Sequence, residues 1–97
     1  MLYVLYCLDK ADASDLRQAN RPAHIEWAGR QTGIRMAGPL LDESETNMIG
    51  SLFVIEADSR ADVTALHRTD PYALAGLFER VEIHPFRWLL GEQAPGS

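Results

Sequence analysis

The segments of this chain that have the composition of β-strands are apolar on both faces, and this feature constrains its fold more than any other. The opening segment 2–8 is apolar at odd and at even positions, and so is the run 52–55. Because successive side chains of a strand point to opposite faces of a sheet, such strands need cover on both sides. A sheet with water on one face would alternate apolar and polar residues instead.

The order of the predicted elements indicates the fold class. With 97 residues the chain is long enough for one domain with a single core. This order, strand-helix-strand-strand-helix-strand, is typical of an α+β ferredoxin-like domain with a four-stranded antiparallel sheet and both main helices on one face. We predict a domain over 1–90, a flexible tail over 91–97, strands over 2–8, 34–41, 48–57 and 81–90, and helices over 15–32, 59–69 and 72–78.

Local signals mark the ends of the first helix. Asp12 or Ser14 is expected to cap its start, and Gly33 is expected to stop it. Pro22 lies inside the segment and predicts a kink or a split at that point, because it removes one backbone donor. We expect the core-facing side to carry the apolar residues that recur at helical spacing, which are Leu16, Ala19, Ala23, Trp27 and Ala28.

Two helices on one face leave the other face of the sheet uncovered. An apolar face of four strands would exceed the patches that monomers usually show to water. The simplest cover is a second copy of the chain, packed sheet against sheet. We therefore predict a homodimer through the open sheet face, on the strength of strand patterning alone.

Charge and cysteine content narrow the classes of partner. The net charge is −5, with nine basic and fourteen acidic residues, which disfavours a surface that tracks nucleic-acid phosphates or docks on anionic lipid. The single cysteine, Cys7, cannot form an internal disulfide. No apolar run approaches the ~20 residues that span a bilayer, and the start lacks the basic lead of a signal peptide. We expect a cytoplasmic protein with no nucleic-acid or membrane partner.

His24 has the most informative neighbours of the three histidines. Arg17 lies seven residues before it and Arg21 three residues before it, so the three side chains lie near one face of the predicted helix. A histidine beside two arginines is disfavoured as a cation and tends to stay neutral and able to take a proton. A solvated basic face with a chance histidine explains the same residues. No histidine has metal-ligand spacing, so we expect no metal.

Asp70, Pro71 and Tyr72 form the second candidate motif. An aspartate before proline commonly caps a helix that begins with that proline, and this structural role explains the motif fully. The functional alternative is that Asp70 orients His24, because a carboxylate fixes the tautomer of a histidine and stabilises its imidazolium form. The residues alone leave both roles open.

The segment between the two central strands carries turn chemistry. Gly38-Pro39, where the second strand is expected to end, and Gly50-Ser51 flank this predicted hairpin, and both pairs are explained by turns or bulges. Residues 42–47 are polar and predict a loop. The sequence contains no phosphate-binding loop, dinucleotide fingerprint or nucleophile elbow, so we expect no cofactor.

Taken in order, several short motifs resemble those of the YCII-like family. They are the opening MLYVLYCLDKAD, Arg17 with Arg21-Pro22-Ala23-His24, Ala37-Gly38-Pro39, Gly50-Ser51, Asp70-Pro71-Tyr72 with Ala75-Gly76, and Pro85-Phe86. The similarity extends from residue 1 to about residue 90, and the ordered series is more specific than any one motif. The resemblance implies a ferredoxin-like fold that forms dimeric α+β barrels, in agreement with the strand patterning.

The resemblance also implies an active site in a cleft near the dimer interface, centred on a His–Asp pair. The histidine falls on His24 and the aspartate on Asp70. The candidate substrate-binding positions that it implies are Arg17 and Arg21 on the first helix, Ser51 on the third strand, and Gly38, Pro39 and Pro71 in the matching motifs.

The function that follows is a cofactor-free lyase or related enzyme acting on a small anionic or phenolic molecule, since one branch of the family removes chloride from a chlorinated hydroxyquinone. His24 would be the general base, Asp70 its orienting partner, and Arg17 or Arg21 the anchor for an oxyanion. One alternative is a non-catalytic dimer that binds a metabolite or supports a partner protein, with His24 and Asp70 too far apart to hydrogen-bond. Another is a cofactor-independent oxygenase. RNA binding is disfavoured, because the chain is acidic and lacks the aromatic strand signature.

Overall fold

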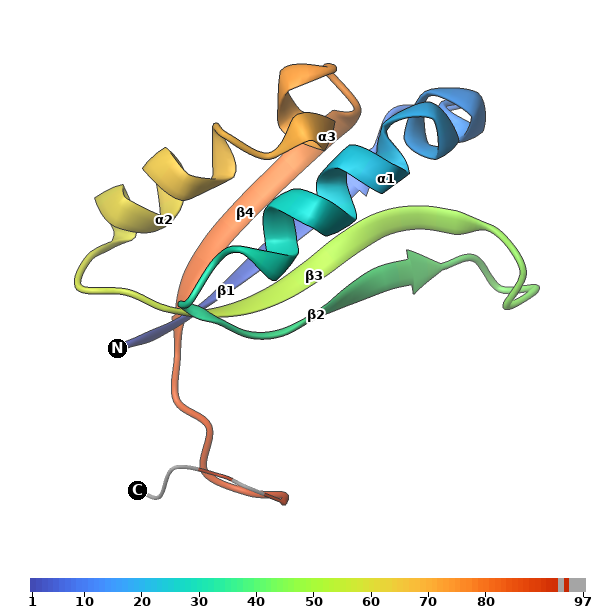
Figure 1. Cartoon of the computed structure of the whole chain (residues 1–97). Coiled ribbons are helices and arrows are strands. Elements are labelled where there is room, and N and C mark those ends of the chain that lie inside the picture. The colour runs from blue at the N-terminus through green and yellow to red at the C-terminus, as the bar shows by residue number, and fades with distance from the viewer. Residues whose placement is uncertain (93, 95–97) are drawn as a thin grey trace.

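The computed structural model describes residues 1–92 and 94, and within them one four-stranded antiparallel sheet carries its helices on a single face (Figure 1). The strands lie in the order β2-β3-β1-β4. This is the ferredoxin-like α+β fold, so the predicted fold class is confirmed. The elements are β1 (Leu2–Asp9), α1 (Ser14–Gly29), β2 (Ile34–Leu41), β3 (Met48–Glu56), α2 (Arg60–His67), α3 (Pro71–Leu74) and β4 (Phe78–Phe86).

The core lies between the sheet and the helices. Alternate residues of the central strand β1 face the helices, and their partners on β3 share that face, as Leu5 with Phe53 and Cys7 with Ser51 show. Burying these side chains against the helices provides the main apolar contribution to stability. The buried core cluster consists of Tyr3, Leu5, Cys7, Trp27, Phe53, Ile55, Val63 and Ile83.

The opposite face of the sheet is also apolar, as the strand patterning predicts. Val4 is paired with Val54, and Tyr6 with Leu52, on the side that no helix of the described chain covers (Figure 1). Towards its margins this face exposes larger apolar side chains, with Met36 at 52%. The described chain therefore covers one face of its sheet and leaves the second open.

The first helix differs from its prediction at both ends. Its N-cap is Ala13, whose side chain accepts no capping hydrogen bond, so the expected caps Asp12 and Ser14 are wrong. The helix continues unbroken through Pro22 and ends at Gly29, before the expected stop at Gly33. Gly33 serves close packing instead, because a Cβ atom there would lie 2.7 Å from the carbonyl oxygen of Glu56.

The side of α1 that faces the core is more polar than predicted. Its buried residues are Arg17 and Trp27. Leu16, Ala19 and Ala23, which were expected to face the core, are exposed. α1 presents Arg17 to the core because the guanidinium of Arg17 pairs there with the carboxylate of Asp9.

The turn predicted at Gly38-Pro39 is wrong, because both residues lie within β2. Pro39 is opposite Ser51, and Gly38 is opposite Leu52. Proline is tolerated here since β2 is an edge strand, where a missing backbone donor breaks no inner ladder. The polar segment 42–47 does form the predicted loop.

The last strand begins and ends earlier than predicted. It covers Phe78–Phe86 rather than 81–90, so Trp88 and Leu89 lie beyond it. The neighbouring strand sets this limit, because Phe86 pairs with Leu2 at the very start of β1. After Phe86 the chain leaves the sheet on the side away from the helices (Figure 1).

The tail predicted to be flexible, 91–97, falls mostly on residues 93 and 95–97, which lie outside the described part. Among the described residues, no helix has both the length and the apolar composition needed to cross a membrane.

Candidate active site

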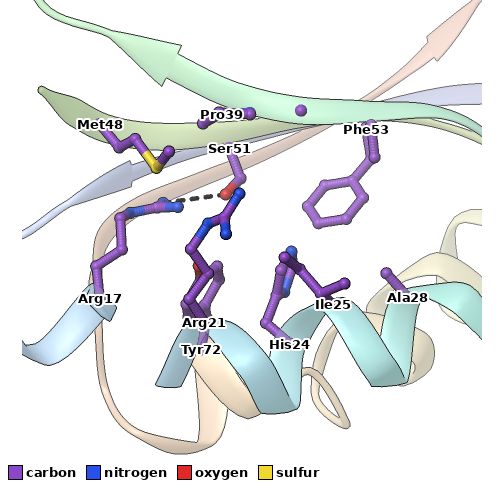
Figure 2. Close-up of a pocket in the computed structure, with 12 residues that line it drawn as sticks. Arg17, Arg21, His24, Ile25, Ala28, Pro39, Met48, Ser51, Phe53 and Tyr72 are labelled. Atoms are coloured by element: carbon purple, nitrogen blue, oxygen red, sulfur yellow. Dashed lines mark hydrogen bonds between the residues drawn. The ribbon is translucent and has the colours of Figure 1, made fainter. Parts of the chain in front are cut away.

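A cavity of ≈ 240 Å³ opens between α1 and the β2–β3 half of the sheet (Figure 2). The helix provides a cationic and imidazole wall, whereas the strands provide small and apolar side chains opposite. Its lining residues are Arg17, Arg21, His24, Ile25, Ala28, Ala37, Gly38, Pro39, Met48, Ser51, Phe53 and Tyr72.

His24 and Asp70 are joined by a hydrogen bond of 2.8 Å between Nδ1 and Oδ1. Asp70 is completely buried and also caps α3, accepting a 2.9 Å hydrogen bond from the Tyr72 backbone amide at the same Oδ1. An ionised Asp70 only accepts hydrogen bonds, so Nδ1 of His24 is the donor, and in the neutral imidazole Nε2 then keeps its lone pair. Asp70 therefore caps α3 and hydrogen-bonds to His24 at the same time. The non-catalytic alternative predicts instead that His24 and Asp70 are too far apart to hydrogen-bond.

Aromatic neighbours hold the imidazole of His24 in place. The Tyr72 ring stacks on it at 4.0 Å between centroids and 16° between planes. Phe53 meets it edge-on at 6.0 Å, and Trp27 lies at 5.8 Å. The side chain of His24 retains 13% exposure, which is the part that lines the cavity. The ring is therefore fixed in orientation yet accessible.

Arg17 is built into the floor of the cavity rather than free within it. Its Nε and Nη2 donate to the two carboxylate oxygens of Asp9 at 2.7 and 2.9 Å, and Nη2 also donates to Ser51 Oγ at 3.0 Å. Its Cζ lies 4.5 Å from the centre of the Tyr72 ring. Burial alone would lower the pKa of Arg17, but the hydrogen bonds and charge of Asp9 outweigh it and raise that pKa. Arg17 is thus a permanent cation with a fixed partner.

Ser51 and Arg21 have groups that could contact a ligand. Because Ser51 Oγ accepts a hydrogen bond from Arg17, its own hydroxyl proton is available to donate elsewhere. Arg21 reaches from α1 towards the sheet, and among the residues drawn in Figure 2 it has no marked hydrogen-bond partner. Together they offer donors to an anionic group.

The structure brings most of the predicted site residues together. His24, Arg17, Arg21, Gly38, Pro39 and Ser51 line one cavity, and Asp70 lies directly behind His24. Pro71 does not line it and serves as the first residue of α3. Their roles in binding or catalysis stay predictions.

Sequence reasoning missed two residues that build the site. Tyr72 belongs to the Asp70-Pro71-Tyr72 motif, but the sequence assigns its side chain no role in the site, although its ring stacks on His24. Asp9 ends β1 and gave no signal of its own, although it fixes Arg17. Asp9 lies eight residues before Arg17 and is separated from α1 by residues 10–13, so no local spacing in the sequence pairs the two. Among residues 1–92 and 94, no group of three or more potential metal ligands is close enough to hold an ion.

The fold and the site together define a small α+β protein in which a buried Asp70 hydrogen-bonds to a partly exposed His24 in the wall of an arginine-lined cavity. The model of the YCII-related domain matches residues 1–87, and the chain belongs to this family. It is 34% identical to Protein YciI of Escherichia coli O6:H1 and to Protein YciI of Shigella flexneri, over 95 residues that cover 90% of this chain and 97% of each relative.

A solved structure is similar as well. It is 5-chloro-2-hydroxyhydroquinone dehydrochlorinase from Burkholderia phenoliruptrix AC1100, in complex with 2,5-dihydroxybenzoquinone. The two chains superpose with a TM-score of 0.79 and 26% sequence identity, covering 89% of this chain and 93% of the other.

Proposed function

We propose that this protein is a cofactor-free enzyme that performs acid–base chemistry on a small anionic or phenolic molecule. The observation that carries the proposal is the 2.8 Å hydrogen bond between His24 and Asp70 at the wall of the cavity. A buried carboxylate behind an accessible imidazole is the arrangement that general-base catalysis uses.

His24 is the proton acceptor in this proposal. With Nδ1 held by Asp70, the Nε2 lone pair is left to take a proton from a bound hydroxyl group. Asp70 orients the ring and stabilises the imidazolium that forms. A positioned base of this kind contributes roughly 10²–10⁴-fold to a rate.

Arg21 is the proposed anchor for the oxyanion of the substrate. Arg17 was an equal candidate from the sequence, but it already donates to Asp9 and Ser51. Arg17 would act by fixing Ser51, whose hydroxyl would donate a hydrogen bond to the substrate in addition to those from Arg21. Arg21 supplies the positive charge that a phenolate or enolate requires.

The lining of the cavity favours a flat ring. Ile25, Ala28 and Phe53 give it an apolar part beside the polar groups, and the neighbouring dehydrochlorinase holds a dihydroxybenzoquinone. We propose a hydroxylated or chlorinated six-membered ring as the substrate class. In the keto tautomer of a chlorinated hydroxyquinol the chlorine-bearing carbon is tetrahedral. Transfer of a hydroxyl proton to His24 Nε2 lets the O–H electron pair form a C=O bond, the ring double bond shifts, and the carbon–chlorine bond breaks to give a quinone and chloride. The proton and the chloride together make hydrogen chloride, so no oxidant or reductant is needed.

A homodimer through the open sheet face completes the proposal. The uncovered face is apolar at Val4, Leu52 and Val54, and the chain beyond β4 leaves the sheet on that same side (Figure 1). Packing two such faces together would form the dimeric α+β barrel. We place the enzyme in the cytoplasm, because its only cysteine is a free, buried thiol that needs no oxidising compartment.

The test is chloride release and spectral change across a panel of chlorinated and unchlorinated hydroxyquinols. We expect turnover of at least one chlorinated compound by the natural protein and a loss of roughly 10²-fold or more in kcat/KM for His24→Ala. The control is Glu26→Ala, an exposed residue of α1 two positions from His24 that does not line the cavity. Activity that survives in His24→Ala, or falls equally in both variants, would rule out the assignment.

A further inference from the structure

Two buried side-chain polar atoms near the His24–Asp70 pair have no hydrogen-bond partner within the described part of the protein. Within residues 1–92 and 94 they are Asp70 Oδ2 and His67 Nδ1. Leaving a buried polar atom unpaired is unfavourable, and almost all such atoms in native proteins are paired with protein or ordered water. The two atoms therefore need hydrogen-bond partners, and a single group placed between them could bind both.

His67 does not line the cavity and lies three residues before Asp70 in the sequence. It is the last residue of α2, and its carbonyl oxygen accepts a 3.0 Å hydrogen bond from the Asp70 backbone amide. Its ring stacks on Phe78 at 5.7 Å, and Phe78 in turn meets the edge of Tyr72. Burial lowers the pKa of His67, and the charge of Asp70 acts against that lowering, so the carboxylate and this imidazole interact.

We propose that Asp70 serves two histidines at once: Oδ1 accepts a hydrogen bond from His24 Nδ1, and Oδ2 is linked through one ordered water to His67 Nδ1. The water would satisfy both unpaired atoms. His67 does not line the cavity, so it is a positioning residue that acts through Asp70. The link rests on the two buried atoms without a partner and on the backbone hydrogen bond that joins the two residues, and only its catalytic meaning rests on the proposed function.

Sharing one carboxylate makes the two imidazoles compete for one negative charge. A proton on His24 offsets the charge of Asp70 and so disfavours a second proton on His67. The other ionisable groups around the pair are the Cys7 thiol of β1 and the Tyr72 hydroxyl of α3, which interact with Asp70, the Arg68 guanidinium after α2, which acts on His67, and the Arg17 and Arg21 guanidinium groups of α1, which act on Tyr72. The thiol stays protonated and Arg17 is paired with Asp9, so Asp70 is the charge that the histidines share.

The experiment follows the imidazole signals of His67 by NMR during a pH titration of the labelled full chain. It compares the natural protein with His24→Gln, Asp70→Asn and the double variant. His84→Gln is the control, because His84 is exposed and pairs with Glu82. No turnover is required, so the result is independent of whether the proposed enzyme activity exists.

We expect His24→Gln to move the pH midpoint of His67 upward by roughly half a pH unit or more, since Asp70 keeps its full charge. His84→Gln should leave that midpoint unchanged, and replacing His24 in the Asp70→Asn background should no longer move it. An unchanged midpoint in His24→Gln would overturn the inference, and so would an equal shift in the Asp70→Asn background. A crystal structure in which Asp70 Oδ2 and His67 Nδ1 share no water would overturn it as well.

Discussion

The Tyr72 ring lies between the side chains of Arg17 and His24, with the Arg17 Cζ 4.5 Å from its centroid and the His24 ring stacked at 4.0 Å. Tyr72 thereby connects a buried ion pair to the histidine that is the proposed base. Two parts of the site that are distant in sequence, the end of β1 and the start of α3, are coupled through one aromatic ring.

Replacing this ring should loosen His24. We expect Tyr72→Leu to reduce the free energy of unfolding by about 2–3 kcal/mol, because it removes two aromatic pairs and one cation–π contact. Tyr72→Phe keeps the ring and should lose less than about 1 kcal/mol. Urea unfolding curves measure both values. If Tyr72→Leu and Tyr72→Phe lost the same free energy of unfolding, the stacking of the ring would not be the source of the stabilisation.

The buried ion pair between Arg17 and Asp9 should matter far more than an exposed pair of the same length. Arg17→Met leaves the Asp9 carboxylate buried and unpaired, which costs about 3–5 kcal/mol. The matched control is Arg80→Met, because Arg80 contacts Glu82 at the same 2.7 Å but is 65% exposed. We expect that control to lose less than about 1 kcal/mol. Adding Asp9→Leu to Arg17→Met should recover part of the loss, and a double variant less stable than Arg17→Met would contradict this explanation.

Cys7 should make the folded state less stable at alkaline pH. Burial first, and then the charge of Asp70, raise the pKa of its thiol from 9.0 to about 12. Above pH 9 the unfolded chain loses this proton while the folded chain retains it, so the free energy of unfolding falls as pH rises, by up to ~1.4 kcal/mol per pH unit. Unfolding curves between pH 8 and 10.5 measure the slope.

Cys7→Ala is the control for that slope. It removes the titrating group, so its stability should fall less steeply with pH over the same range. Identical slopes in the two proteins would mean that Cys7 ionises equally in the folded and unfolded states.

The open sheet face gives a prediction about assembly. Leu52→Lys places a charge in the centre of that face, where it is paired with Tyr6, and should shift the protein from dimer to monomer in sedimentation at micromolar concentration. Arg35→Lys, at an already exposed position of β2, should leave the dimer intact. A natural protein that sediments as a folded monomer would contradict the proposed dimer and remove the partner from the neighbourhood of the cavity.

The sequence predicts the fold well because the apolar runs mark the strands directly. The range 34–41 and the polar loop 42–47 are correct, and Asp70 caps α3 as the Asp-Pro motif indicates. The end of β4 could not be predicted, because it depends on where β1 begins, and pairing partners are not visible in one strand. Long-range contacts set such boundaries, whereas local periodicity does not.

The same limit applies to the site. Spacing on α1 places Arg17, Arg21 and His24 on one side of the helix, and the structure agrees. The prediction that Leu16 faces the core was nevertheless wrong, since this residue is exposed. The prediction assumed that the apolar side of a helix is the side that packs on the core. Here a paired Arg17 faces the core, and its partner Asp9 can be identified only in three dimensions.

The central claim is that His24 Nε2 faces the bound molecule while Asp70 holds Nδ1. It is tested most directly by titrating ¹⁵N-histidine-labelled protein with 2,5-dihydroxybenzoquinone and following the imidazole nitrogens by NMR. We predict a saturable change at Nε2 of His24, no change at His84, and weaker binding in Arg21→Gln. Absence of binding, or binding that leaves the His24 signals unmoved, would contradict the account.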